Sequence, residues 1–137
     1  MLTITFLTGC VSVQIPPEQI NQKTFTQESE KSYKDAYRII AKQVRACYAL
    51  MGPFGGYQVQ ADLDTVTKSG TVELYKVGIK GAQKPEDSTV YRMVTINDAP
   101  NGSLISVTGT TPKVVYLTHR TIPNWLKGNE SCGIEKN

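Results

Sequence analysis

The chain has 137 residues, of which 39% are hydrophobic and 20% are charged. This composition fits one globular domain and excludes a chain that is disordered through high charge and low hydrophobicity. Lys and Arg outnumber Asp and Glu by 15 to 12, and the resulting net charge of +3 is too small to indicate a nucleic-acid partner.

Residues 1–9 form an uncharged stretch that ends in small residues just before Cys10. The stretch is too short for a transmembrane helix, which takes about 20 residues, and it fits the apolar core and cleavage region of a secretory signal. The run Leu7-Thr8-Gly9-Cys10 resembles the lipobox of small bacterial cell-envelope lipoproteins, many of which have no assigned activity. Because a basic n-region is missing, we expect the true start codon to lie upstream.

The lipobox resemblance implies a protein that is held at a membrane by a lipid anchor. Residues 1–9 would be the remnant of a cleaved signal peptide, and the Cys10 thiol would carry acyl chains such as palmitate. Because Val11 and not Asp follows the cysteine, the resemblance implies an outer-membrane lipoprotein that faces the periplasm of a Gram-negative cell. The resemblance implies a location and no activity.

The next segment, residues 10–28, is polar and contains the pair Pro16-Pro17. Consecutive prolines favour an extended, semi-rigid backbone. We therefore expect a lipidated N-terminus with a flexible tether over residues 10–28, followed by a single α+β domain over residues 29–137.

An amphipathic helix is predicted to begin near Ser32, which is followed by Asp35 in a pattern typical of helix N-termini, and Ser29 is an alternative, earlier cap. Its apolar residues recur at intervals of four, three, four and three: Tyr33, Tyr37, Ile40, Val44 and Cys47. The pair Gly52-Pro53 is a natural stop, since Pro cannot continue a helix.

After Gly55-Gly56 the hydrophobic period changes from helical to two, which predicts strands. Arg92 interrupts the apolar face of the third of them. The predicted strands cover residues 57–64, 71–80, 89–97, 104–110 and 114–118. Their short connections favour antiparallel pairing, so we expect an α+β fold with one N-terminal amphipathic helix packed on a four- to five-stranded antiparallel sheet.

Two cysteines remain once Cys10 is assigned to the lipid. Cys47 lies at the end of the predicted helix and Cys132 lies in the C-terminal tail. An exported protein meets an oxidising compartment, where such a pair is expected to form a disulfide. The alternative is two separate buried thiols.

Few residues offer catalytic or metal-binding chemistry, so we predict no catalytic residue, no metal site and no cofactor. His119 is the only histidine, and a zinc site needs three or four ligands at suitable spacing. Asp62 and Asp64 alternate on one face of a predicted strand, and with Glu73 they are the carboxylates that an enzyme acting on glycans or the cell wall would use.

The leading hypothesis is a non-enzymatic, lipid-anchored protein that binds or scaffolds another cell-envelope component, with an envelope protein as partner. Its candidate binding surface is a basic stripe along the helix: Lys34, Arg38, Lys42 and Arg45. This stripe could dock on anionic lipid or peptidoglycan, and the alternative is an ordinary solvated helix face. The alternatives are an enzyme that uses the strand carboxylates and an inhibitor-like protein that binds lysozyme. Lysozymes are basic, so such an inhibitor should be acidic, whereas this chain is mildly basic.

Overall fold

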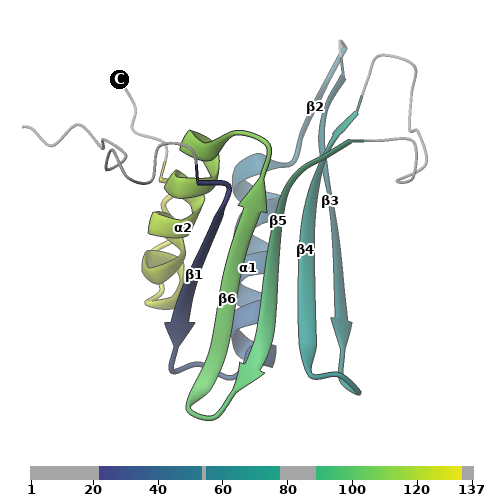
Figure 1. The fold of residues 1–137 in the computed structure, drawn as a ribbon. Helices are drawn as coiled ribbons and strands as arrows, with labels where there is room; N and C mark the ends of the chain where they lie inside the picture. The colour runs from purple at the N-terminus through teal and green to yellow at the C-terminus, as the bar shows by residue number, and fades with distance from the viewer. Residues whose placement is uncertain (1–21, 54, 78–88, 134–137) are drawn as a thin grey trace, which may run out of the picture.

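The computed structural model describes residues 22–53, 55–77 and 89–133 (Figure 1). Cys10, the lipobox and most of the expected tether lie outside these residues. The elements in chain order are β1 (Thr24–Ser29), α1 (Tyr33–Tyr48), β2 (Leu50–Gly52), β3 (Gly55–Asp64), β4 (Ser69–Val77), β5 (Thr89–Ala99), β6 (Gly102–Gly109) and α2 (Pro112–Leu126).

The strands form one antiparallel sheet of six, in the order β1-β6-β5-β4-β3-β2. Both helices pack against the same face of the sheet and contact each other, as Figure 1 shows. The α+β class is therefore as predicted. The details differ, because the sheet has more strands than expected and a second helix shares its covered face with α1.

The first correction concerns the end of the expected tether. Residues 24–29 form β1, which pairs with β6 along its whole length, from Thr24 opposite Thr108 to Ser29 opposite Ser103. Consequently α1 is not the first element of the domain. The sequence of residues 24–29 resembles a polar tether because five of the six side chains are polar. Phe25 is the one residue of the strand that is buried.

The second correction concerns residues 114–118, which are predicted as a strand and form part of α2. Pro112 occupies the first turn of this helix, where its missing N–H costs nothing. The buried residues follow helical intervals of three, three, one and three: Val115, Thr118, Thr121, Ile122 and Trp125. The β-branched pair Val114-Val115 favours a strand locally, and packing against the sheet overrides that preference.

The start of α1 agrees with the prediction, because the Ser32 hydroxyl accepts a hydrogen bond of 3.2 Å from the backbone N–H of Asp35. The core lies between the helices and the covered face of the sheet. It includes Ala36, Ile40 and Val44 of α1, Ile122 and Trp125 of α2, and Val72, Val94, Ile96, Ile105 and Val107 of the sheet. In the part of the chain that the structure describes, no helix is both long and apolar enough to cross a bilayer.

Candidate functional site

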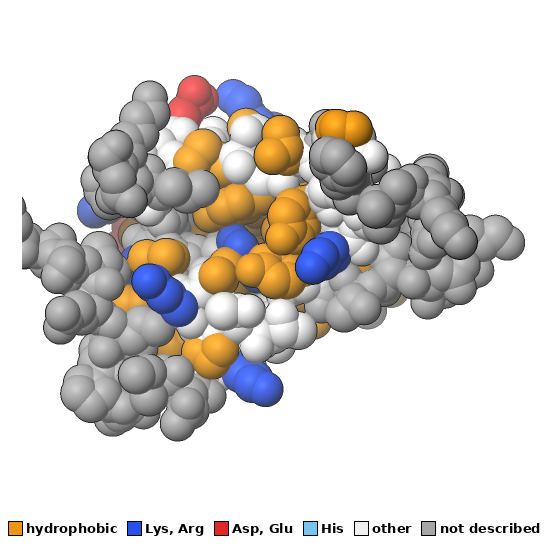
Figure 2. Space-filling model, turned by 90° about the horizontal axis from the view of Figure 1, so that it is seen from above, with side chains coloured by type: hydrophobic (Ala, Val, Ile, Leu, Met, Phe, Trp, Pro, Cys, Tyr) orange, Lys and Arg blue, Asp and Glu red, His pale blue; other side chains and the backbone are white. Residues whose placement is uncertain are grey.

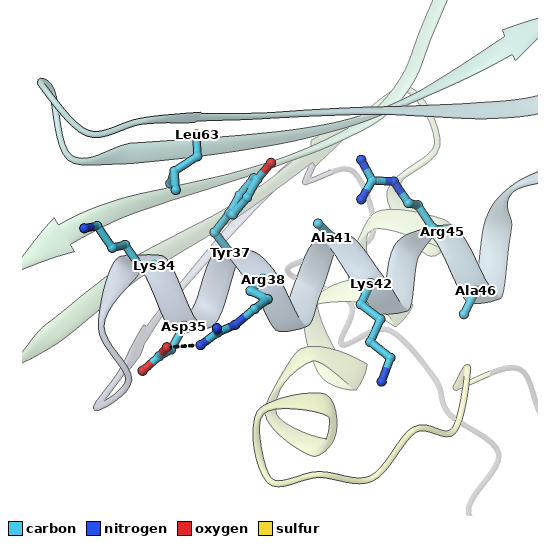
Figure 3. A pocket seen from close by; sticks show the side chains of 9 residues that line it. All are labelled: Lys34, Asp35, Tyr37, Arg38, Ala41, Lys42, Arg45, Ala46 and Leu63. Carbon is cyan, nitrogen blue, oxygen red and sulfur yellow. Dashed lines mark hydrogen bonds and ion pairs between the residues drawn. The ribbon is translucent and has the colours of Figure 1, made fainter.

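The predicted basic stripe lies along an open groove on the solvent side of α1, with a volume of about 860 Å³ (Figure 3). Lys34, Arg38, Lys42 and Arg45 all line this groove, and all four side chains are exposed. The helical spacing accounts for the arrangement, because residues three and four apart lie on the same side of a helix. The structure therefore brings together the four residues that the sequence singles out; we call this surface the α1 groove.

The wall of the α1 groove toward the sheet is apolar. In Figure 3, Tyr37 of α1 and Leu63 of β3 point toward each other above the helix, and Lys34 lies beside them. Leu63 is 39% exposed, which is unusual for a leucine on the helix-covered side of the sheet. The sequence does not identify Leu63 as a site residue, because its alternation with Ala61 predicts only a core position.

Two of the four cations have acidic neighbours. Arg38 pairs with Asp35 on the same helix, and the Lys42 ammonium lies 3.3 Å from a Glu130 carboxylate oxygen. Both pairs are solvent-exposed, so each contributes at most about 1 kcal/mol and can be exchanged for a stronger anionic ligand. Lys34 and Arg45 form no ion pair with any residue in the described ranges.

The groove also borders an open stretch of sheet edge. β2 pairs with only the first residues of β3, from Leu50 opposite Tyr57 to Gly52 opposite Gly55. Beyond this point, residues 58–64 of β3 pair with β4 on one side and with no described strand on the other. An open strand edge presents unpaired N–H and C=O groups to an extended chain.

The disulfide expected between Cys47 and Cys132 is present, with a Cα–Cα distance of 5.3 Å. It ties the C-terminal tail to the end of α1. The Trp125 indole N–H donates to the Ser131 carbonyl at 2.6 Å, and the Tyr48 hydroxyl lies 3.5 Å from the Cys132 carbonyl. These contacts explain how a tail with little periodicity is held in place.

His119 is packed as a structural side chain between α2 and β1. Its ring stacks on Phe25 with centroids 5.3 Å apart, and the Gln27 amide donates both to Nδ1 at 3.1 Å and to the His119 carbonyl at 2.8 Å. Burial lowers the pKa of His119, which favours the neutral ring.

The strand carboxylates of the enzyme hypothesis lie on the sheet face that is turned away from the helices. Asp64 accepts hydrogen bonds from the backbone of Thr67 and Val66, and these bonds lower its pKa. Glu73 accepts a hydrogen bond from Tyr75, and burial, followed by the neighbouring Glu73, raises the pKa of Tyr75 to about 12. Asp62, Asp64 and Glu73 line neither the α1 groove nor four further cavities among the described residues.

Within the described ranges, no cluster of three or more His, Cys, Asp or Glu side chains is placed to hold a metal ion. The chain matches no protein-family model, no curated protein and no solved structure. Function is therefore inferred from the α1 groove, its charged residues and the adjoining open edge of β3.

Proposed function

We propose that this protein is a non-enzymatic binding module of the cell envelope, anchored through a lipid on Cys10, that holds an acidic, extended segment of an envelope protein partner in the α1 groove. The observation that carries the proposal is the coincidence of four exposed cations with an open strand edge along one groove.

The charges favour an anionic ligand. Four cations line the groove and Asp35 is the only acidic residue among its lining. Cations grouped along one groove raise the local concentration of an acidic partner and accelerate its association.

The open edge of β3 favours an extended peptide, and not a flat bilayer, as the ligand of the α1 groove. A strand added at residues 58–64 would form main-chain hydrogen bonds with β3, and every second side chain would face the helix side of the sheet. Acidic side chains at those positions would meet Lys34 and Arg45, and small apolar ones would contact Leu63 and Tyr37. A flat bilayer offers no such main-chain partners.

The anchor would set the reach of the module. Since β1 begins at Thr24, the tether shortens to residues 10–23, which when fully extended span at most about 50 Å. Thr24 must then lie within that distance of the membrane that holds Cys10, and the domain itself extends the reach of the groove beyond it. Labelling with a palmitate analogue tests the anchor: the wild type should be marked and Cys10→Ala should not.

The groove is tested by neutralising its cations together, as Lys34→Gln, Arg38→Gln, Lys42→Gln and Arg45→Gln in one variant. A matched control removes four exposed lysines elsewhere: Lys23→Gln, Lys76→Gln, Lys113→Gln and Lys127→Gln. Both variants lower the net charge equally. The probe is an amidated peptide of alternating Glu and Val, measured by fluorescence anisotropy.

We expect the groove variant to bind the peptide about tenfold more weakly or worse, and the control to keep most of the wild-type affinity. A peptide that is N-methylated at every residue should lose binding, because neither of its edges can donate main-chain hydrogen bonds to β3. Equal losses in the two charge variants would show that net charge alone attracts the peptide. If the wild-type protein binds anionic vesicles or isolated peptidoglycan more tightly than the peptide, the ligand of the α1 groove is a membrane or the cell wall and not a peptide.

A further inference from the structure

A separate cavity of about 310 Å³ lies where α1 ends, beside β2 and the first turns of α2. Figure 2 looks onto this end of the molecule and shows hydrophobic side chains gathered around a hollow, with basic side-chain atoms visible among them. Tyrosine rings and leucine side chains make up much of its described lining: Tyr48, Tyr57, Tyr91, Leu50, Leu74 and Leu117. The Cys47–Cys132 disulfide forms part of its wall. We call this space the Arg92 cavity.

Arg92 lines this cavity and is 6% exposed. One guanidinium nitrogen donates to the Thr118 hydroxyl, and the guanidinium carbon lies 4.4 Å from the centre of the Tyr48 ring. Among the residues that the structure describes, its Nε is buried without a hydrogen-bond partner and no carboxylate forms an ion pair with the guanidinium. Burying a charge without a counter-ion costs several kcal/mol, which the contact with Tyr48 offsets only in part.

A β-bulge places two neighbouring residues in the same cavity. On β4 and β5, Leu74 pairs with Arg92, whereas the next residue, Tyr75, pairs with Val90, so Tyr91 is the extra residue. In a regular strand, neighbouring side chains point to opposite faces. The bulge redirects the chain here, and both Tyr91 and Arg92 line the cavity.

We propose that the Arg92 cavity binds a small carboxylic acid with an apolar body, such as a medium-chain fatty acid. The carboxylate supplies an anion that none of the described residues offers to Arg92, and a guanidinium and a carboxylate match in charge and geometry. The apolar body lies against the tyrosine and leucine side chains and emerges past Leu50, which is 72% exposed at the edge of β2. The volume falls at the lower end of the range for small-molecule sites, about 300–1,000 Å³.

The lining also selects against more polar ligands. Apart from Arg92, the described side chains around the cavity are aromatic, aliphatic or disulfide sulfur, and the tyrosine hydroxyls are their only other strong hydrogen-bonding groups. A sugar, a nucleotide or a peptide would bury many polar groups there without partners, at about 1–3 kcal/mol each. A fatty acid buries only its carboxylate.

Isothermal titration calorimetry of the oxidised protein with decanoate and with 1-decanol, both below their aggregation limits, tests the proposal. The two ligands share the same apolar body and differ in charge. We expect decanoate to bind about tenfold more tightly than decanol or better. Arg92→Met should abolish this preference and leave the affinity for decanol nearly unchanged.

Two further variants keep the test decisive. Leu117→Trp fills the cavity without touching the charge and should weaken the binding of both ligands, while Arg120→Met removes an exposed arginine of the same helix and should change neither. The groove variant described above should still bind decanoate, which separates this site from the α1 groove. The proposal is overturned if decanoate and decanol bind alike, if decanoate binding survives Arg92→Met, or if decanoate does not bind at about 1 mM.

Discussion

Gly70 lies directly beneath the ring of Tyr37, so that a Cβ atom added to Gly70 would come within 2.6 Å of the Tyr37 Cδ2. The glycine on β4 thus lets α1 approach the sheet, and it positions the tyrosine that walls the α1 groove. A side chain at this point must push the tyrosine, the helix or both away from the sheet.

Gly70→Ala should therefore destabilise the protein, by about 1–3 kcal/mol in the free energy of unfolding measured with urea. Tyr37→Ala removes the obstacle, so in that background Gly70→Ala should cost much less. A double-mutant cycle of the four proteins measures this coupling. If the losses of unfolding free energy in the two single variants simply add up in the double variant, the contact between residue 70 and the Tyr37 ring is not the cause of the destabilisation.

The disulfide closes a loop with a sequence separation of 85 residues. In the chain-entropy model such a closure contributes about 4.5 kcal/mol, so Cys132→Ser should lower the free energy of unfolding by about 2–4.5 kcal/mol. Reduction of the wild type should have the same effect and should leave Cys132→Ser unchanged. If the reductant also destabilises that variant, the loss does not come from this bond.

His119 should make stability depend on pH. Its pKa in the folded protein lies below the ordinary value of 6.5, so the unfolded chain binds more protons than the folded one between the two values. The stabilising contribution of the neutral ring is complete above pH 6.5 and is lost as the pH falls through the folded pKa. Urea midpoints measured from pH 7.5 down to pH 5 should therefore decrease.

His119→Gln should flatten this decrease, because glutamine does not titrate. The lowered pKa of Asp64 acts in another range, below the ordinary carboxylate value of 3.8, and does not overlap with that of His119. If the urea midpoint of His119→Gln decreases as steeply as that of the wild type, groups other than His119 cause the pH dependence.

Arg92→Met should also be informative without any ligand. Replacing a buried charge that pairs with no described carboxylate by an apolar side chain of similar length is expected to raise the free energy of unfolding by about 1 kcal/mol. Arg92→Ala, which leaves a void, should instead lower it by about 2 kcal/mol or more. A clear loss of stability in Arg92→Met would mean that the contacts with Thr118 and Tyr48 hold the fold together, and that the guanidinium serves structure.

The parts of the fold that sequence predicts best are those that local chemistry determines. Ser32 caps α1 because its hydroxyl lies within reach of the Asp35 N–H, and that relation needs no tertiary partner. The stripe from Lys34 to Arg45 follows from helical spacing alone, and the structure places it on one groove.

The parts that sequence misses depend on distant partners. Thr24 belongs to a strand because Thr108 lies opposite it, 84 residues away in the chain. Val114 and Val115 are helical because α2 buries Val115 against the sheet. Arg92 does leave a signal, since a charge interrupts an otherwise apolar strand face, but only the bulge beside Tyr91 shows that both residues line one cavity.

The pairing of β1 with β6 has a mechanical consequence for a chain held by its N-terminus. A pull on residue 24 along the strand would strain all six residue pairs between β1 and β6 together, whereas a pull away from the sheet would open them one after another, from the Thr24–Thr108 pair onwards. Because β1 is an edge strand, it can detach while the other five strands stay paired. Tension on the proposed anchor would thus act first on β1 and on the core residue Phe25 that this strand carries.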